Sequence, residues 1–375
     1  MGVENEDSRY MALAVLEAEK GLGRTSPNPA VGAVIVQQNQ VVGWGYHQKV
    51  GTPHAEVHAI ANAGQRARGG VLYVTLEPCH HHGRTPPCTE AILRAGLSTV
   101  VIGMPDPNPK VTGGGAQYLH QQGIEVRFGV LEEQCRALNY PFIKHSGTGL
   151  PWITMKAGLS LDGRISRRRG QGEPLTGPQS KEYVHRLRNL SDAILIGVDT
   201  ALIDDPSLTT RLVDVQDSRD PLRVILDSRL RLSPDARMLR QDSTAQTWVF
   251  CGETACHQKE ARLSDAGARV VRIPTNRVQH LDLVAVFRFL GEQNCTSVLV
   301  EGGARIHGAV WRQGLVDEML LFYAPFIIGD LGTPLVENFH LKRRPVTSIF
   351  SHPTVQLLGN DILVRGLIQH ELRIV

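Results

Sequence analysis

The sequence predicts two consecutive α/β domains, and three observations support this. The chain has 375 residues, more than one hydrophobic core of ordinary size needs. Short apolar runs of strand type alternate with helix-like stretches through both halves, which indicates sheets covered by helices. Between the halves lies SGTGLP, a segment rich in turn-forming residues and the best candidate linker. We therefore expect domains at residues 1–146 and 151–375.

The elements of the first half alternate in type. An opening helix carries apolar residues from Met11 and closes at Gly21. The elements that follow are, in chain order, strands AVGAVIVQ (30–37) and VVGWGYH (41–47), a helix from His54, strand VLYVTLEP (71–78), helix TEAILRAG (89–96), strand STVVIGM (98–104), a helix through Tyr118, strand IEVRFG (124–129) and the amphipathic stretch 131–145.

The second half repeats this alternation without repeating the sequence. Its first strand runs from Trp152 into a loop that ends near Ile165, and a helix follows over residues 178–190. Six buried-type strands come next: AILIGV (193–198), LRVILDS (222–228), TWVFCG (247–252), ARVVRIP (268–274), SVLVEGG (297–303) and MLLFYAPFII (319–328).

Composition and charge exclude several classes of protein. Hydrophobic residues make up 42% of the chain and charged residues 21%, which excludes a disordered or coiled-coil protein. The net charge of +3 is too small for a dedicated binder of nucleic acid or anionic membranes. The first ten residues are acidic and lack the apolar run of a secretory signal. We expect a cytoplasmic protein with no nucleic-acid or membrane partner.

Two of the six cysteines stand among residues that suit a metal ion. His54 and Glu56 open a predicted helix, Cys79 follows a strand, and Cys88 comes nine residues later at the start of another helix. One imidazole and two thiolates leave the fourth position of a tetrahedral zinc ion for water, whose pKa zinc lowers to about 7. Glu56 could accept the proton of this water and pass it to a leaving amine. This His-x-Glu and Pro-Cys pattern is typical of zinc deaminases.

Two alternatives exist for this cluster. A structural zinc site closed by His80, His81 or His82 would have no use for Glu56. A nucleic-acid deaminase is disfavoured by the small net charge and the second domain, and by the long spacing between the cysteines, since cytidine and transfer-RNA adenosine deaminases have a shorter Pro-Cys-x-x-Cys. The remaining cysteines are expected to be buried small residues or surface thiols. They are Cys135, Cys251, Cys256 and Cys295.

Longer motifs on both halves show a family resemblance. They are TSPNPAVGAVIV, HAEVHAI, YVTLEPCHHHGRTPPCTEAI and MPDPNPKVTGGG in the first half, and KAGLSLDGRI, VHRLRN, DDPSLTTR and VEGGARIHGA in the second. Over nearly its whole length the chain resembles the bifunctional riboflavin-biosynthesis deaminase–reductases. The resemblance implies a cytidine-deaminase-like three-layer α/β/α domain followed by a dihydrofolate-reductase-like α/β domain.

The resemblance also implies two consecutive reactions on one phosphoribosyl pyrimidine. With Zn²⁺, the first domain would hydrolyse the 2-amino group of 2,5-diamino-6-(5-phosphoribosylamino)pyrimidin-4(3H)-one. With NADPH, the second would reduce the ribosyl group to ribityl. One rival reading keeps the deaminase and makes the second domain an impaired scaffold. Another is a zinc-stabilised binding protein without turnover. The sequence leaves the oligomeric state open, a homo-oligomer included.

Site residues follow from the same resemblance. Glu56 would be catalytic, and His54, Cys79 and Cys88 the zinc ligands. Asn28 would contact the pyrimidine, or else serve only as a turn residue between two prolines. Cofactor contacts would be Gly158, Thr200, Asp204, Ser228 and the stretch Gly303, Ala304, Arg305, Ile306, His307, Gly308 and Ala309. Substrate contacts would be Arg188, Leu208, Arg211 and Glu301, with Lys156 either polarising the sugar or anchoring its loop.

Physical reasons accompany some of these assignments. A strand, a glycine pair and a helix at residues 297–309 place backbone N–H groups where a phosphate can bind, although a plain tight turn would look alike. The planar guanidinium of an arginine matches a phosphate, and the substrate carries one.

The chain departs from the family pattern at two positions. Gly172 and Pro174 stand where the family usually has a Ser that contacts substrate and a Trp that contacts cofactor. We expect one of Arg167, Arg168 and Arg169, just upstream, to reach the phosphate instead, and the reductase to work.

Overall fold

The computed structural model of the chain forms two compact units, Met1–Gly149 and Leu150–Val375. It describes residues 3–80, 86–108, 114–212, 214–215, 217–276, 279–339 and 349–369. The expected linker is shorter than its composition indicated, because helix α6 (Tyr140–Thr148) runs through its first three residues. Gly149, with φ of 71°, ends this helix in the left-handed conformation that glycine adopts without strain.

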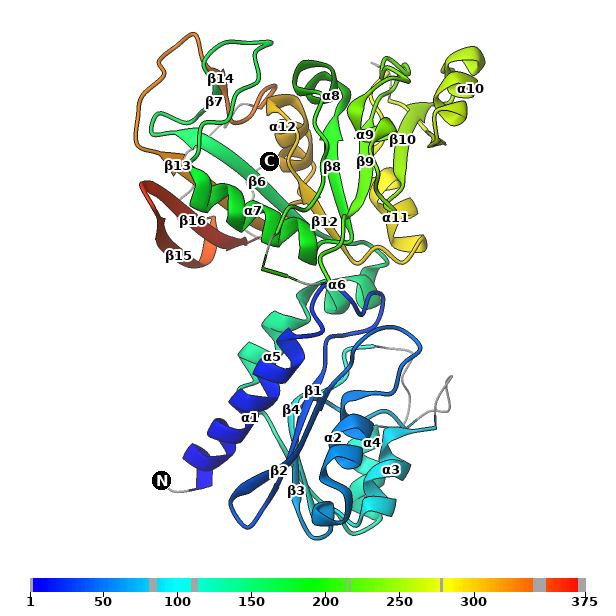
Figure 1. Cartoon of the computed structure of the whole chain (residues 1–375), viewed down its shortest axis with the longest axis vertical. Helices are drawn as coiled ribbons and strands as arrows, with labels where there is room; N and C mark the ends of the chain where they lie inside the picture. Colours follow the sequence, from blue (N-terminus) through cyan, green and yellow to red (C-terminus); the bar gives the residue numbers. More distant parts are fainter. Residues whose placement is uncertain are drawn as a thin grey trace. The chain divides into compact units, whose positions relative to one another are not determined.

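The first unit is a five-stranded sheet between two layers of helices (Figure 1). Its strands are β1 (Gly32–Gln37), β2 (Gln40–Tyr46), β3 (Val71–Leu76), β4 (Thr99–Met104) and β5 (Glu125–Phe128). The order is β2-β1-β3-β4-β5, with β1 antiparallel to both neighbours and β3, β4 and β5 mutually parallel. Helices α1 (Val3–Glu19) and α5 (Glu132–Leu138) cover one face, and α2 (Ala55–Ala63), α3 (Cys88–Ala95) and α4 (Gly115–Gln121) the other. This is the expected three-layer arrangement.

Burial on both faces explains why the strands of this sheet could be read from sequence. Strands β3 and β4 are almost entirely buried, as continuous apolar runs between two helix layers should be. Helix α1 lies against β1 so closely that a Cβ atom on Gly32 would come within 2.0 Å of the Ala14 carbonyl oxygen. A larger residue at position 32 would therefore push this helix off the sheet.

The second unit is built on a nine-stranded sheet in the order β11-β10-β9-β8-β12-β6-β13-β16-β15. Its strands from β11 to β13 run parallel, and β16 and β15 continue it antiparallel. The strands are β6 (Trp152–Ser160), β8 (Ala193–Gly197), β9 (Leu222–Leu226), β10 (Thr247–Gly252), β11 (Ala268–Ile273), β12 (Ser297–Val300), β13 (Glu318–Ala324), β15 (Phe350–Leu358) and β16 (Asp361–Ile368). Two short strands, β7 (Arg164–Ser166) and β14 (Thr333–Pro334), pair separately.

Helices connect the parallel strands of the second unit. They are α7 (Pro178–Leu190), α8 (Val198–Asp204), α9 (Arg237–Arg240), α10 (His257–Asp265), α11 (Leu283–Glu292) and α12 (Ala304–Arg312). Strands β8 and β12 are neighbours, so the turns that lead into α8 and α12 meet at the carboxyl edge of the sheet. In parallel α/β sheets ligands bind in the crevice at such an edge.

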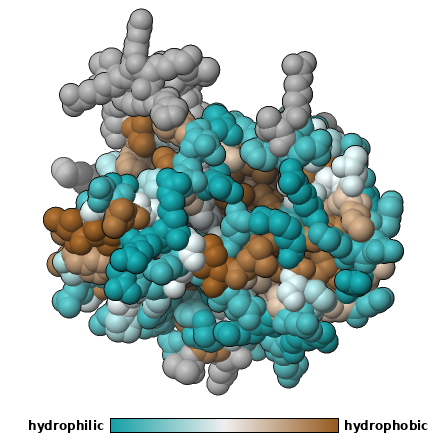
Figure 2. All heavy atoms as spheres, turned by 90° about the horizontal axis from the view of Figure 1, so that it is seen from above, coloured by the Kyte–Doolittle hydropathy of each residue, from teal (hydrophilic) through white to brown (hydrophobic). Residues whose placement is uncertain are grey.

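Figure 2 shows hydrophilic residues over most of the face seen from above, with apolar residues in separate patches. Large exposed apolar side chains of the second unit include Ile327, Leu331, Val355 and Leu357, and none of the four lines the cavity described below. Within the described residues, no helix combines the length and the apolar character that crossing a bilayer requires.

Candidate zinc and cofactor sites

Three side chains converge in the first unit. His54 occupies the N-cap position of α2, Cys88 is the first residue of α3, and Cys79 lies in the loop after β3. The Nδ1 atom of His54 lies 3.2 Å from Sγ of Cys88 and 3.5 Å from Sγ of Cys79, and the three ligand atoms lie within 4.8 Å of one another. Bond lengths of about 2.0–2.3 Å in a tetrahedral site place ligand atoms roughly this far apart. The donor set therefore fits one zinc ion.

The histidines after Cys79 bear on the structural-zinc alternative. Nδ1 of His80 lies 3.1 Å from the Thr89 hydroxyl, and its ring stacks on Tyr118 with centroids 3.9 Å apart. His80 is therefore engaged elsewhere, while His81 and His82 lie outside the described residues. Among the residues that the structure describes, only His54, Cys79 and Cys88 form such a group in this unit.

Glu56 lies in the first turn of α2, beside the three candidate ligands, and is only 3% exposed. Burial raises the pKa of its carboxyl group, and the negative charge of Cys79 adds to this, against the positive charge of His54. A carboxyl group whose proton affinity is raised in this way suits general acid–base work near neutral pH.

His47, which sequence reasoning did not single out, connects Asn28 to this cluster. Its Nε2 atom lies 3.2 Å from the Nδ2 atom of Asn28, and its Nδ1 atom 3.3 Å from the Pro53 carbonyl oxygen. Its ring also meets that of His54 edge-on, with centroids 5.3 Å apart. A lone histidine at the end of a strand carries no local signal of such a role.

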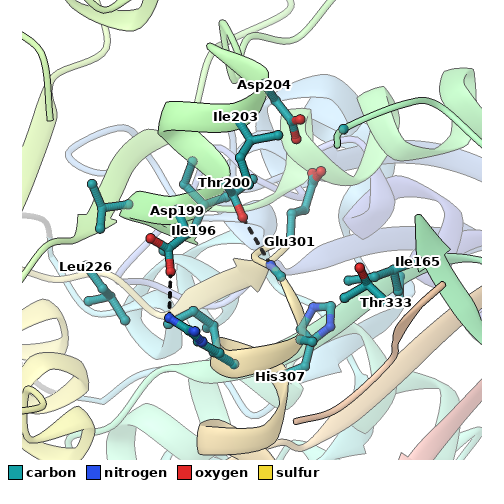
Figure 3. A pocket seen from close by; sticks show the side chains of 18 of the residues that line it. Ile165, Ile196, Asp199, Thr200, Ile203, Asp204, Leu226, Glu301, His307 and Thr333 are labelled. Atoms are coloured by element: carbon teal, nitrogen blue, oxygen red, sulfur yellow. Dashed lines mark hydrogen bonds and ion pairs between the residues drawn. The ribbon is translucent and has the colours of Figure 1, made fainter. Parts of the chain in front are cut away.

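The second unit contains a cavity of about 1170 Å³ at the carboxyl edge of its sheet (Figure 3). The backbone N–H of Gly303 donates to the Thr200 hydroxyl over 3.2 Å, joining the α12 turn to α8. A Cβ atom on Gly302 would lie 2.8 Å from the backbone nitrogen of Gly197. The glycine pair thus lets two strand-to-helix turns come close, forming a cradle that suits the diphosphate of a dinucleotide.

Most of the expected cofactor residues line this cavity. They are Gly158, Thr200, Asp204, Ser228, Gly303, Ala304, Arg305, Ile306, His307 and Ala309. Gly308 instead packs against the chain, because a Cβ atom there would lie 2.0 Å from the Glu337 carbonyl oxygen. The cavity and its glycine cradle fit NADPH.

The expected substrate residues Arg188, Leu208, Arg211, Glu301 and Lys156 also line the cavity. Arg188 donates to both carboxylate oxygens of Glu301, over 2.8 and 2.9 Å, and to the Thr209 carbonyl oxygen. Nζ of Lys156 lies 3.8 Å from Oε2 of Glu301. Burial alone would raise the pKa of Glu301, but the charges of Arg188 and Lys156 lower it to about 2. Arg188 therefore holds Glu301 in position, and its guanidinium group is already engaged rather than free to bind a phosphate through two hydrogen bonds.

The protonated form of Lys156 is less favoured than that of an exposed lysine. Burial lowers the pKa of its ammonium group, and the attraction of Glu301 opposes this shift.

Asp162, from the same sequence motif, has a structural role. It accepts hydrogen bonds from the Ser160 hydroxyl and from the backbone N–H groups of Ile328 and Gly329, so it anchors its loop.

The two positions that depart from the family pattern both lie at the cavity. A Cβ atom on Gly172 would fall 1.4 Å from Oδ1 of Asp204, so this carboxylate occupies the space of a side chain at position 172. Of the upstream arginines, Arg169 lines the cavity and approaches Glu337 at 3.4 Å. Arg167 is bound to Glu173 instead.

The six cysteines are all unpaired. Cys135, Cys251 and Cys295 are buried and Cys256 is exposed, which confirms the expected division between buried small residues and a surface thiol.

Comparisons with known proteins agree with both sites. The family model described as "Cytidine and deoxycytidylate deaminase zinc-binding region" matches residues 4–104, and the "RibD C-terminal domain" model matches residues 151–363. The riboflavin biosynthesis protein RibD of Escherichia coli K12 is 40% identical over 367 residues, covering 95% of this chain and 98% of that protein. The RibD of Bacillus amyloliquefaciens is 42% identical over 325 residues, covering 87% and 86%.

Solved structures give the same result. RibD of Acinetobacter baumannii superposes with a TM-score of 0.86 at 36% identity, covering 98% of this chain and 99% of that one. The diaminohydroxyphosphoribosylaminopyrimidine deaminase/5-amino-6-(5-phosphoribosylamino)uracil reductase of Thermotoga maritima gives 0.85 at 35% identity, with the same coverage. The fold and the two sites define a bifunctional enzyme, a zinc-dependent deaminase joined to an NADPH-dependent reductase. The chain belongs to the RibD family of riboflavin biosynthesis.

Proposed function

We propose that the chain catalyses two consecutive steps on one phosphoribosyl pyrimidine. The first unit removes the 2-amino group of 2,5-diamino-6-(5-phosphoribosylamino)pyrimidin-4(3H)-one as ammonia, and the second reduces the ribosyl group of the product to ribityl. The observation that carries the proposal is that each unit has its own complete set of groups. Glu56 lies beside His54, Cys79 and Cys88, and Lys156 and Glu301 line the cavity with the glycine cradle.

In the deaminase unit, His54, Cys79 and Cys88 would hold zinc, which when bound supplies a Lewis acid that activates water. Glu56 would move protons from the water that is consumed to the ring nitrogen and to the amine that leaves. Its burial and raised proton affinity support this double role. Asn28 would orient the pyrimidine, because His47 fixes its side-chain amide.

In the reductase unit, the cradle at Gly302 and Gly303 would hold NADPH, which supplies a hydride. Lys156 would donate to the sugar oxygen that gains a proton as the ribosyl ring opens. Its lowered pKa favours release of a proton. Glu301 would hold Lys156 in place, with Arg188 holding Glu301. Arg211, which lines the same cavity, would bind the substrate phosphate.

The proposal includes a location and a class of partner. Both reactants of the second step are phosphorylated small molecules that do not cross membranes unaided, so we place the enzyme in the cytoplasm. The net charge of +3 supports small-molecule partners over nucleic acid.

The decisive experiment follows ammonia release and NADPH oxidation in matched variants. Cys88→Ser should lose zinc and ammonia release while it keeps oxidation of NADPH with the deaminated intermediate. Arg211→Ala should weaken NADPH oxidation and keep ammonia release. Loss of both activities in either folded variant would contradict the two-site proposal. A wild-type protein that releases ammonia but never oxidises NADPH would instead establish the scaffold alternative.

A further inference from the structure

Two of the sequence motifs meet at the reductase cavity. VHRLRN lies on α7 and supplies His185 and Arg188, and DDPSLTTR lies after α8 and supplies Leu208 and Arg211. All four residues line the cavity. Because Arg188 is already engaged with Glu301, binding of the substrate phosphate falls to Arg211. Of the four, only His185 has no role in the reactions described above.

The loop after α8, which carries the phosphate-binding arginine, has a backbone conformation that its surroundings must hold. Leu208 is buried, and its φ of 53° lies in the left-handed region that residues other than glycine rarely adopt. Such a conformation persists only where neighbouring groups fix it. Nη1 of Arg188 donates to the Thr209 carbonyl oxygen over 3.1 Å. The backbone N–H of Thr210 donates to Oδ1 of Asp220 over 2.7 Å. The position of this loop therefore depends on the side chains that bind its backbone.

His185 binds the backbone of the arginine itself. Its Nδ1 atom accepts a hydrogen bond from the backbone N–H of Arg211, 3.3 Å away. Because a backbone N–H can only donate, this nitrogen carries the lone pair and the ring proton lies on Nε2. Burial lowers the pKa of His185, and the positive charges of Arg188 and Arg211 add to this, against the negative charge of Glu301. The ring is therefore neutral at neutral pH, and its Nδ1 atom stays available as an acceptor.

We propose that His185 is a positioning residue of the reductase, which holds the backbone of Arg211 through Nδ1 so that the guanidinium group can reach the substrate phosphate. The inference rests on the proposed function, since it takes Arg211 as the phosphate-binding residue. His185 and Arg188 are three positions apart on α7, so they lie on one face of this helix and together hold the loop. Loss of the His185 contact should therefore weaken binding of the phosphorylated substrate and leave turnover and cofactor binding unchanged.

Two amide substitutions distinguish the two ring nitrogens. The amide oxygen of an asparagine takes the place of Nδ1 in a histidine, whereas the longer amide of a glutamine reaches the place of Nε2. His185→Asn should therefore keep an acceptor for the backbone of Arg211, and His185→Gln and His185→Phe should lose it.

Reductase kinetics of the full-length protein are measured with the deaminated intermediate and with the same compound lacking its phosphate. His185→Phe should raise the KM for the phosphorylated compound about three- to tenfold, the worth of one ordinary hydrogen bond. The KM for the dephosphorylated compound, the KM for NADPH and kcat should stay within about twofold of wild type. His185→Asn should restore the KM of the wild type and His185→Gln should not, which gives the same test if the apolar ring of His185→Phe disturbs folding.

His257→Phe provides the matched control. His257 is a histidine of the same unit whose side chain is 87% exposed and which is absent from the cavity lining, so its loss should change none of these constants. Rescue by His185→Gln but not by His185→Asn would show that Nε2 binds the substrate directly, and would overturn the inference. Equal effects of His185→Phe on the two compounds, or no effect on either, would also overturn it.

Arg211→Ala separates this inference from the proposed function. If Arg211→Ala removes the preference for the phosphorylated compound and His185→Phe leaves it intact, only the positioning role of His185 is wrong. If Arg211→Ala leaves the preference intact, the phosphate-binding role of Arg211 is wrong and the inference fails with it.

Discussion

The Nε2 atom of His47 lies 3.2 Å from the Nδ2 atom of Asn28, and this contact fixes the orientation of the Asn28 amide. The Pro53 carbonyl can only accept, so the Nδ1 atom of His47, 3.3 Å away, carries the proton. Burial lowers the pKa of His47, which keeps the ring neutral and Nε2 free to accept from Asn28. The amide oxygen of Asn28 is then the atom left for a substrate donor.

Replacing His47 should therefore act through Asn28. In His47→Phe the ring volume is kept but both nitrogens are lost, so we expect the KM of the deaminase to rise about three- to tenfold, the worth of one ordinary hydrogen bond. Zinc content, measured by elemental analysis, should stay the same because His54, Cys79 and Cys88 remain. His120→Phe, a change at an exposed histidine of the same unit, serves as the control. Loss of zinc in His47→Phe would show that packing against His54 matters more than Asn28.

Glu56→Gln should separate zinc binding from proton transfer. The three candidate ligands are untouched, so zinc content should match the wild type. Ammonia release should fall by about 10³- to 10⁴-fold, the upper range for a general acid–base group, because one carboxyl group serves both proton transfers. NADPH oxidation with the deaminated intermediate should not change. A deaminase within about tenfold of wild type would remove Glu56 from the mechanism.

The buried pair of Glu301 and Arg188 should give the reductase unit a characteristic acid response. The pKa of Glu301 falls from 4.5 to about 2 on folding, so its ionised form stabilises the fold fully above about pH 4.5. This contribution is lost as the pH falls toward 2. At pH 7, Glu301→Gln should lower the free energy of unfolding by about 3–5 kcal/mol, since it leaves buried cations without a partner.

Urea titrations of wild type and Glu301→Gln at pH 7, 4 and 3 measure this response. The difference between the two proteins should shrink as the pH falls. A difference that stays constant across this range would mean that Glu301 is not the group that titrates.

A serine at position 172 should not simply restore the family pattern. Because Oδ1 of Asp204 occupies the space of the missing Cβ atom, Gly172→Ser must turn that carboxylate or shift its loop. We expect weaker NADPH binding, seen in a fluorescence titration, because Asp204 is a proposed cofactor contact. Gly172→Ser/Asp204→Ala, which removes the obstructing carboxylate, is the comparison variant. If Gly172→Ser alone binds NADPH as the wild type does, the Asp204 side chain is free to move aside.

Among the upstream arginines, Arg169 rather than Arg168 should contribute to substrate binding. Arg169 lines the cavity and Arg168 is not part of the lining. In steady-state assays Arg169→Ala should raise the reductase KM for the deaminated intermediate about tenfold, while Arg168→Ala and the deaminase activity of both variants stay unchanged. Equal kinetics in the two variants would contradict any compensation for Gly172.

The sequence predicted the zinc group and most strands because both depend on local patterns. Strand β4 is buried along its whole length, so its apolar run was distinctive. The ligands His54 and Cys88 begin helices, where short motifs place them. Strand β15 escaped detection because most of its side chains are exposed, which leaves no apolar alternation to recognise.

Relationships between distant residues could not be predicted in this way. Arg188 and Glu301 are 113 positions apart in the sequence. Only the folded structure shows that they form an ion pair in which each neutralises the charge of the other. The sequence supported a phosphate-binding role for Arg188, whereas its donors are directed at Glu301 and a carbonyl group. The same limit applies to Gly172, whose missing side chain gains meaning only beside Asp204.

The close approach of Gly302 to Gly197 has a consequence for how this enzyme can evolve. A methyl group at position 302 would lie 2.8 Å from the backbone of the adjacent strand, and backbone cannot rotate aside as a side chain can. Position 302, at the floor of the cofactor crevice, therefore accepts no residue larger than glycine unless the backbone moves. Changes in cofactor binding must therefore arise at positions that line the cavity with side chains, such as Thr200 and Ser228, rather than at this turn.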